Sequence, residues 1–230
     1  MSEKIHPTQT KDSVEIKHEQ IAELEEPIRN ILKEILPKIE KGEYGLIIGI
    51  DTSGRIPTLI IDKLVNYIYT QKGNDFSRTR FLAGRGDKEE TKKQIEIWGP
   101  SKKVLIIDDT FIVGNAIRFL TEALREMKVP FDIVAVSGLG GNYRESALNI
   151  GAGKIYIGKS DNAAIVNAKH LSGVHKYAGD KFSKSYKKLM EEEHDNNLPL
   201  IQETMNEARA DVDVVVNNLI DWYESQKQDK

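Results

Sequence analysis

Apolar residues along this chain fall into short continuous runs, and each run is followed by a longer stretch in which apolar and polar positions mix. The clear runs cover residues 44–50, 104–107, 132–138 and 154–157, with a weaker run near 79–83. Such runs are typical of strands buried on both faces, as in a parallel sheet. The stretches between them predict helices at 57–69, at 116–127 and around 144–150. The alternation of strand and helix therefore predicts an α/β fold, an open and mostly parallel sheet flanked by helices.

Further helices are predicted on both sides of this core. An N-terminal pair is expected at 13–24 and 27–41, divided at Pro27, and Pro199 starts a long helix. A narrow heptad seam recurs in that helix at alternating four- and three-residue steps, formed by Ile201, Met205, Ala208, Val212, Val215, Leu219 and Trp222. The seam either packs on its own domain or contacts a second copy or another partner. We expect residues 1–12 to be a flexible tail, 13–182 to form the α/β domain, and 183–230 to be a C-terminal helical extension.

Composition narrows the class of protein. At 230 residues the chain is long enough to bury a full core in one domain. Its 33 basic and 36 acidic side chains nearly balance, which gives no global electrostatic reason for general nucleic-acid or membrane binding. No apolar run has the length of a membrane span, and the N-terminus shows no signal-peptide core. The absence of cysteine excludes disulfides and thiol catalysis, and it fits a cytoplasmic protein.

Candidate chemistry is concentrated after the run at 104–107. Asp108 and Asp109 follow it directly, then a short loop with Gly114, then the predicted helix. Ligands of open α/β sheets bind where strands end, and free N–H groups at a helix N-terminus favour phosphate. Two carboxylates beside such a phosphate-binding loop suit a ligand with vicinal hydroxyls, a divalent metal, or both. A phosphorylated sugar has this combination of groups.

Other interpretations of the acid pair remain open. Aspartates at a strand end also cap helices, bind Mg²⁺ in receiver domains, or act as Walker B acids. A receiver would carry the pair on its first strand and a phospho-acceptor aspartate after a later one. After the run at 154–157, Asp161 lies too far along the chain for that role. A P-loop motif, GxxxxGK[ST], does not occur in the sequence.

A second polar loop follows the run at 44–50. Its residues bring a carboxylate, two hydroxyls, a glycine and one guanidinium to the same predicted edge of the sheet, in the order Asp51, Thr52, Ser53, Gly54 and Arg55. The loop suits an anion such as pyrophosphate. It also suits an Asx turn or a helix N-cap, and capping and phosphate binding can coexist.

Residues 104–116 resemble the phosphoribosyl-pyrophosphate (PRPP) motif of the type I phosphoribosyltransferases, a family with a Rossmann-like sheet. The resemblance implies that Asp108 and Asp109 hold the ribose hydroxyls, that the loop after them wraps the 5′-phosphate, and that residues 51–55 form the pyrophosphate loop. The residues it assigns to PRPP and phosphate are Asp51, Thr52, Ser53, Gly54, Arg55, Asp108, Asp109, Thr110, Phe111, Ile112, Val113, Gly114, Asn115 and Ala116. The catalytic candidates are Arg55, Asp108 and Asp109.

The chain departs from the family at Val113 and Ala116, where Thr or Ser is usual. A hydrogen bond to a charged group contributes roughly 1.5–3 kcal/mol, so two missing hydroxyls weaken the expected phosphate site. Thr110 and Asn115 are candidates to replace them. Ligand binding is therefore expected more firmly than efficient turnover.

The family also carries a mobile catalytic loop between its second and third core strands. The candidates here are Arg85, Lys88, Lys92 and Lys93, although mixed charges between strands usually form a solvated helix face or loop. The segment 161–180, which contains His170, His175 and Tyr177, corresponds to the acceptor pocket of relatives. Two histidines without a third ligand or a cysteine make a zinc site improbable.

The function implied by the resemblance is transfer of the 5-phosphoribosyl group from PRPP to a nitrogen of a nucleobase or related acceptor, with release of pyrophosphate. Mg²⁺ would be bound mainly through the PRPP, with Asp108 and Asp109 as further candidate ligands. The alternative is a non-catalytic regulator that binds PRPP or a nucleotide and signals through its helical extensions. A third possibility is a scaffold that has kept the fold and binds no ligand.

Overall fold

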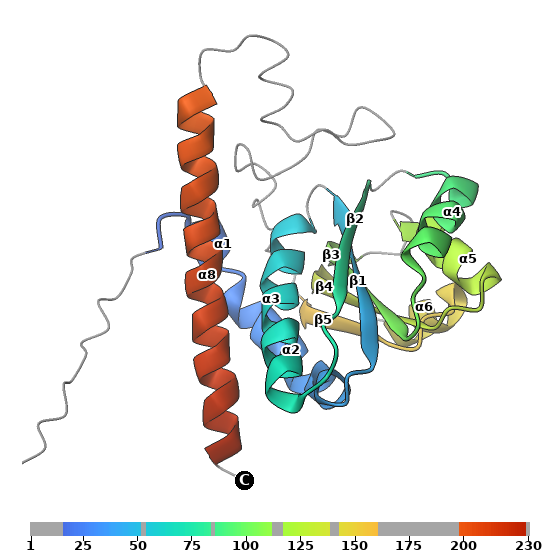
Figure 1. Ribbon diagram of the computed structural model, residues 1–230, viewed down its shortest axis with the longest axis horizontal. Helices are drawn as coiled ribbons and strands as arrows, with labels where there is room; N and C mark the ends of the chain where they lie inside the picture. The colour runs from blue at the N-terminus through green and yellow to red at the C-terminus, as the bar shows by residue number, and fades with distance from the viewer. Residues whose placement is uncertain are drawn as a thin grey trace, which may run out of the picture.

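The computed structural model describes residues 16–51, 54–83, 86–111, 117–138, 143–160 and 198–228. Five strands form one sheet, and every neighbouring pair is parallel (Figure 1). The strands are β1 (Tyr44–Asp51), β2 (Arg78–Ala83), β3 (Lys103–Phe111), β4 (Phe131–Gly138) and β5 (Ile155–Lys159), and their order across the sheet is β2-β1-β3-β4-β5. The predicted α/β class with a parallel sheet is confirmed, because each predicted apolar run has become a strand.

Helices cover both faces of the sheet. One face carries α1 (Glu19–Ala22), α2 (Glu25–Glu40) and α3 (Arg55–Lys72). The other face carries α4 (Lys88–Trp98), α5 (Arg118–Glu126) and α6 (Tyr143–Ile150). Figure 1 shows the long helix α8 (Leu198–Gln228) outside α3, as a further layer on the first face. Each face of the sheet therefore has its own hydrophobic core.

Helix α8 is part of the core on the first face. Its buried side chains are Ala208, Val212, Val215, Val216, Leu219 and Tyr223. The seam therefore packs on its own domain, which was one of the two predicted interpretations. The predicted end of the seam is wrong by one residue, because Tyr223 is 1% exposed whereas Trp222 is only partly buried. A straight helix has 3.6 residues per turn, so the buried stripe drifts from a strict heptad along a helix of this length.

Polar contacts also attach α8 to the domain. The Tyr223 hydroxyl donates to Glu40 Oε1 at 3.0 Å, and the Tyr67 hydroxyl donates to Glu224 Oε1 at 3.1 Å. On the other side, the Asp211 carboxylate accepts the backbone N–H groups of Lys17 and His18, at 3.1 and 2.8 Å. Oligomerisation through α8 stays a prediction, and the side chains of the seam that are buried in the core are not available to contact a second copy.

Several helix boundaries differ from those predicted. The first helix is shorter than 13–24 within the described residues, and α2 starts at Glu25 rather than at the predicted break, Pro27. Proline is tolerated there because the N–H groups of a first helical turn have no partner within the helix. For the same reason Pro57 is tolerated in α3, where it is the third residue of a helix that starts at Arg55.

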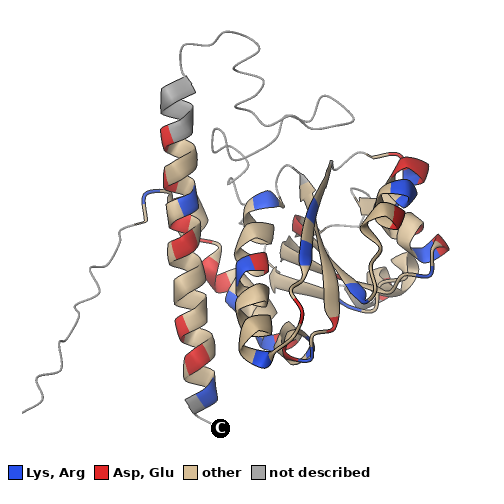
Figure 2. Cartoon of the chain, viewed as in Figure 1, with Lys and Arg blue, Asp and Glu red and all other residues tan. Residues whose placement is uncertain are grey.

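Figure 2 shows Lys and Arg intermixed with Asp and Glu on most elements, whereas α8 carries more acidic than basic residues. In the described part of the chain, no helix combines the length and the apolar character that crossing a membrane needs. A cytoplasmic location stays a prediction. The predicted flexible tail and the predicted domain boundary after residue 182 lie outside the described residues.

Candidate functional site

The order of the strands brings the two predicted loops together. From β1 the chain passes to β2 on one side, and it then crosses to β3 on the other side of β1. A parallel sheet binds ligands at such a switch point, outside the carboxyl ends of the two strands. Here those strands are β1, which leads to Gly54 and Arg55, and β3, which holds Asp108 and Asp109.

Gly54 shows how closely the two segments pack. A Cβ atom added to Gly54 would lie 2.8 Å from the Ile50 carbonyl oxygen, 2.9 Å from the Ile107 carbonyl oxygen and 3.1 Å from Asp108 Cα. These are backbone atoms, so no side-chain rotation would make room. The start of α3 therefore lies directly against the acid pair, as a site shared by the two loops requires.

The acid pair itself lies within β3 and not after its end, which corrects the predicted boundary. The strand continues to Phe111 because β4 extends beside it, with Asp108 opposite Ala135 and Thr110 opposite Ser137. Asp108 is 5% exposed and Asp109 is 8% exposed. The Asp109 N–H donates to Asp108 Oδ1 at 2.9 Å. Both carboxyl groups are thus held in place by a paired strand.

Burial raises the pKa of Asp108 well above its ordinary value, and the neighbouring Asp109 raises it further through its negative charge and a hydrogen bond between the two side chains. Two buried acids this close share a proton more readily than they both ionise. A ligand that donates hydroxyl hydrogens, or a divalent cation, would stabilise the ionised pair. The site is therefore built in a way that costs stability in the absence of a ligand.

The buried acid at the opposite edge of the sheet is a useful contrast. Asp132 is fully buried near the start of β4, where it accepts hydrogen bonds from the Tyr44 hydroxyl at 2.6 Å and from Lys38 Nζ at 2.8 Å. Burial alone would raise the pKa of Asp132, but Lys38, Tyr44 and the charge of Lys103 lower it below its ordinary value. A structural acid in this fold is neutralised by its neighbours, whereas Asp108 is placed beside another acid.

Arg55 is held at the same edge by an aromatic side chain. Its guanidinium carbon lies 4.4 Å from the centroid of the Phe81 ring of β2, within the range of a cation–π contact. The ring in turn lies against Gly49 of β1, where an added Cβ would be 2.7 Å from Phe81 Cε1. Gly49 therefore allows Phe81 to lie across the strand beneath the guanidinium.

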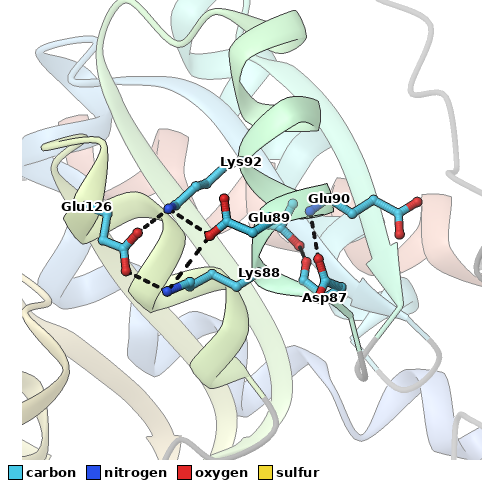
Figure 3. A network of polar contacts seen from close by, with 7 residues as sticks. Asp87, Lys88, Glu89, Glu90, Lys92 and Glu126 are labelled. Atoms are coloured by element: carbon cyan, nitrogen blue, oxygen red, sulfur yellow. Dashed lines mark hydrogen bonds and ion pairs between the residues drawn. The ribbon is translucent and has the colours of Figure 1, made fainter.

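The predicted mobile loop is largely a helix, which corrects that prediction from Lys88 onward. Asp87 caps α4, and its carboxylate accepts the Glu90 N–H at 2.9 Å. Figure 3 shows Lys88 and Lys92 directed at Glu126 of α5, with Lys88 Nζ 2.7 Å from Glu126 Oε1. Hydrogen bonds from these two lysines lower the pKa of Glu126 to about 2.

This network accounts for two of the four predicted loop residues. Lys88 and Lys92 join α4 to α5, and Lys92 also contacts Glu89 at 3.0 Å. Lys93 is exposed on α4, and Arg85 lies outside the described residues. None of the three described lysines is brought to Asp108 by a contact that the structure shows. Their direct role at the site stays a prediction without support from this arrangement.

Part of the predicted site lies outside the described residues. This applies to Thr52 and Ser53, to the segment 161–180, and to the phosphate loop formed by Ile112, Val113, Gly114, Asn115 and Ala116. Of Asp51 only the backbone is described, as the last residue of β1. Among the described residues, no cluster of three or more His, Asp or Glu side chains would hold a metal ion. The pair Asp108 and Asp109 by itself offers two carboxylates, which fits a magnesium ion bound mainly through a ligand.

Sequence reasoning missed Phe81 and Tyr143. The Tyr143 ring, at the start of α6, makes an edge contact with Phe111, with the ring centroids 6.3 Å apart. Neither residue belongs to a recognisable motif. Their positions follow from contacts between strands and helices that a sequence pattern does not encode.

Comparisons with known proteins give little further information. No protein-family model matches the chain, and no curated protein matches it. Among solved structures, the chain is similar to the purine phosphoribosyltransferase from Pyrococcus horikoshii OT3, with 12% sequence identity and a TM-score of 0.37. The similarity covers 61% of this chain and 83% of that one. A likeness of this size establishes neither family nor activity.

Proposed function

We propose that the carboxyl edge of β1 and β3 binds PRPP with Mg²⁺, and that the chain transfers its phosphoribosyl group to a nitrogen acceptor with release of pyrophosphate. The observation that carries the proposal is the contact of Gly54 with Asp108, 3.1 Å from an added Cβ to Asp108 Cα. It places a cationic helix start beside a buried acid pair. A ligand that fits both must offer hydroxyl groups to the acids and an anionic group to Arg55.

PRPP meets these requirements. Its ribose 2′- and 3′-hydroxyls would donate to the carboxylates of Asp108 and Asp109, which replaces the repulsion between the two acids with hydrogen bonds. Its pyrophosphate would lie beside Arg55 and the N–H groups of the first turn of α3, which favour an anion. Mg²⁺, when bound, would offset negative charge on the pyrophosphate, with the acid pair as candidate protein ligands.

In the proposed reaction, the bond between ribose C1 and the pyrophosphate oxygen breaks, and the electron pair leaves with the pyrophosphate. A bond forms between C1 and the acceptor nitrogen, which then releases a proton. Arg55 stabilises charge that grows on the leaving group, and the contact with Phe81 holds its guanidinium in one place. Charged groups positioned in advance in this way lower the activation barrier more than mobile groups do, since they need no reorganisation during the reaction.

A second candidate function is a PRPP or nucleotide sensor without turnover. The observation in its favour is the position of α3, whose first residue is Arg55 and whose outer side packs on α8. A ligand at the edge of the sheet would thereby act directly on α3, the helix on which the C-terminal helix α8 packs. The residues Val113 and Ala116 also favour this function, because they lack the hydroxyls usual in the enzymes.

A pyrophosphate-release assay with PRPP, Mg²⁺ and a panel of nucleobases distinguishes the two functions. For an enzyme, Arg55→Ala should lower kcat more than it raises the Kd for PRPP, since the charge is most needed as the bond breaks. Arg209→Ala, an exposed arginine on α8, is the matched control and should change neither value. PRPP binding without pyrophosphate release for any base would replace the enzyme by the sensor.

A further inference from the structure

Two buried hydroxyl groups at the ligand-binding edge have no hydrogen-bond partner. Among the described residues, only four buried side-chain nitrogen or oxygen atoms are unpartnered, on Arg29, Thr110, Asp132 and Tyr143. Native proteins pair the great majority of their buried polar atoms, so each exception needs a physical reason. Thr110 and the Tyr143 hydroxyl both lie at the carboxyl ends of β3 and β4, which suggests one reason for both hydroxyls.

That location is the β4 side of the acid pair. Thr110 follows Asp108 by two residues near the end of β3, where β4 lies beside it. Tyr143 starts α6 and packs, like Phe111, against the core on the face covered by α4, α5 and α6. Its hydroxyl lies over the end of β4, because a Cβ added to Gly138 would be 2.6 Å from that oxygen.

Register places Thr110 beside the residues that Tyr143 contacts. Thr110 pairs with Ser137, and the next residues, Phe111 and Gly138, are also opposite each other. The Tyr143 ring contacts Phe111 edge-on, and its hydroxyl reaches Gly138. Thr110 and the Tyr143 hydroxyl therefore both lie at the last residues of two neighbouring strands. Arg55 lies on the opposite, β1 side of the acid pair.

The ligand chemistry follows from this division. A phosphoribosyl ligand has its sugar hydroxyls in the middle and anionic groups at both ends. If the acids hold the sugar and Arg55 faces one anionic end, the other end extends toward β4. Hydroxyl groups donate well to phosphate oxygens, and such bonds are among the stronger ones in proteins.

We propose that the Thr110 and Tyr143 hydroxyls bind the 5′-phosphate of the ligand and replace the hydroxyls that Val113 and Ala116 do not provide. The inference rests on the proposed function, since it assumes a phosphoribosyl ligand over Asp108 and Asp109. It accounts for the burial of two hydroxyls without partners in the ligand-free chain. It also assigns a role to Tyr143, which lies outside the motif on which the resemblance is based.

The test is a titration of the full chain with ribose 5-phosphate and, separately, with magnesium pyrophosphate. Tyr143→Phe should weaken ribose 5-phosphate binding by about ten- to hundred-fold and leave pyrophosphate binding unchanged. Thr110→Val should act in the same direction. Tyr67→Phe is the matched control, because the Tyr67 hydroxyl is paired with Glu224 far along α3 and should not affect either ligand.

Thermal unfolding without ligand provides an independent readout. Tyr143→Phe should keep or raise the Tm, because it removes an unpaired hydroxyl, whereas Tyr67→Phe should lower it. A Tm for Tyr143→Phe lowered as much as the control's would overturn the inference, since it would show a structural partner. Unchanged ribose 5-phosphate affinity in Tyr143→Phe would also overturn it, while the proposed function would stand. If the wild-type chain binds neither PRPP nor ribose 5-phosphate, both proposals fail together.

Discussion

Replacing Gly54 with alanine tests the packing of the two loops directly. The backbone of Gly54 is in the right-handed helical region, with φ −74° and ψ −2°, so alanine is conformationally acceptable there. By reducing the freedom of the unfolded chain, such a change contributes about 0.4–1 kcal/mol of stability. Against this, the new methyl group would meet the carbonyl oxygens of Ile50 and Ile107 at 2.8 and 2.9 Å.

These two contacts are closer than a real Cβ allows, and both are with backbone atoms. Overpacking of this kind costs about 1–3 kcal/mol. The net expectation for Gly54→Ala is a loss of up to about 2.5 kcal/mol in the free energy of unfolding, measured by urea denaturation. Relief of the clash moves the start of α3 away from Asp108. Since a misplacement of about 1 Å can cost on the order of a hundred-fold in rate, pyrophosphate release should fall by roughly ten- to hundred-fold.

Gly73→Ala is the matched control for this experiment. Gly73 has φ +68°, which is unfavourable for alanine by roughly 1–2 kcal/mol, and an added Cβ would meet no atom within 4 Å. The control should therefore lose similar stability at the far end of α3 and keep its affinity for PRPP. If Gly54→Ala matched the wild type in both stability and PRPP affinity, the close contact between the two loops would be refuted.

Three further predictions concern single contacts. Asp108→Asn should raise stability at neutral pH, because the folded pKa of Asp108 is raised. The stability of the wild type therefore falls as pH rises from the unfolded pKa near 3.8 through the folded pKa. A Tm profile with the same pH slope in the variant would contradict this. Phe81→Leu should lower turnover by about two- to five-fold, because it removes the cation–π contact with Arg55. Phe81→Tyr keeps an aromatic ring and should not lower turnover. Equal losses for the two variants in steady-state assays would show that the ring does not position Arg55. Asp211→Ala should cost about 1–3 kcal/mol and speed hydrogen exchange at the Lys17 and His18 amides, which it leaves unpaired; unchanged exchange would exclude this anchoring role.

The strands could be predicted from sequence because they are buried on both faces. In β3, six consecutive residues from Val104 to Asp109 are buried, and the apolar run of four with which they begin is typical of a strand inside a parallel sheet. The continuation of β3 to Phe111 could not be predicted, since it depends on the backbone of β4 lying beside the acid pair. For the segment of α4 the sequence left a solvated helix and a loop open, because Thr91 and Ile95 are its only buried residues and give almost no periodic signal among its charges.

The candidate site shows the same limit more sharply. The acids and the loop at 51–55 were found from their places after two apolar runs, which is local information. Their meeting at Gly54 depends on the strand order, which no periodicity encodes. Phe81 and Tyr143 act through contacts with residues of other elements, Arg55 and Phe111. The proposed type of ligand therefore follows from local sequence, whereas tertiary structure was needed to identify the residues that support the candidate site.

The measurement that tests the central claim most directly is a calorimetric titration of wild-type protein and Asp109→Asn with PRPP in the presence of Mg²⁺. Asp213→Asn, an exposed acid on α8, serves as a control of equal charge change. The proposed ribose clamp predicts binding to the wild type and to the control, and binding weakened by about ten- to hundred-fold in Asp109→Asn at nearly unchanged thermal stability. No binding to the wild type, or equal binding to Asp109→Asn with a large loss of its stability, would contradict the clamp and leave the acid pair a structural role.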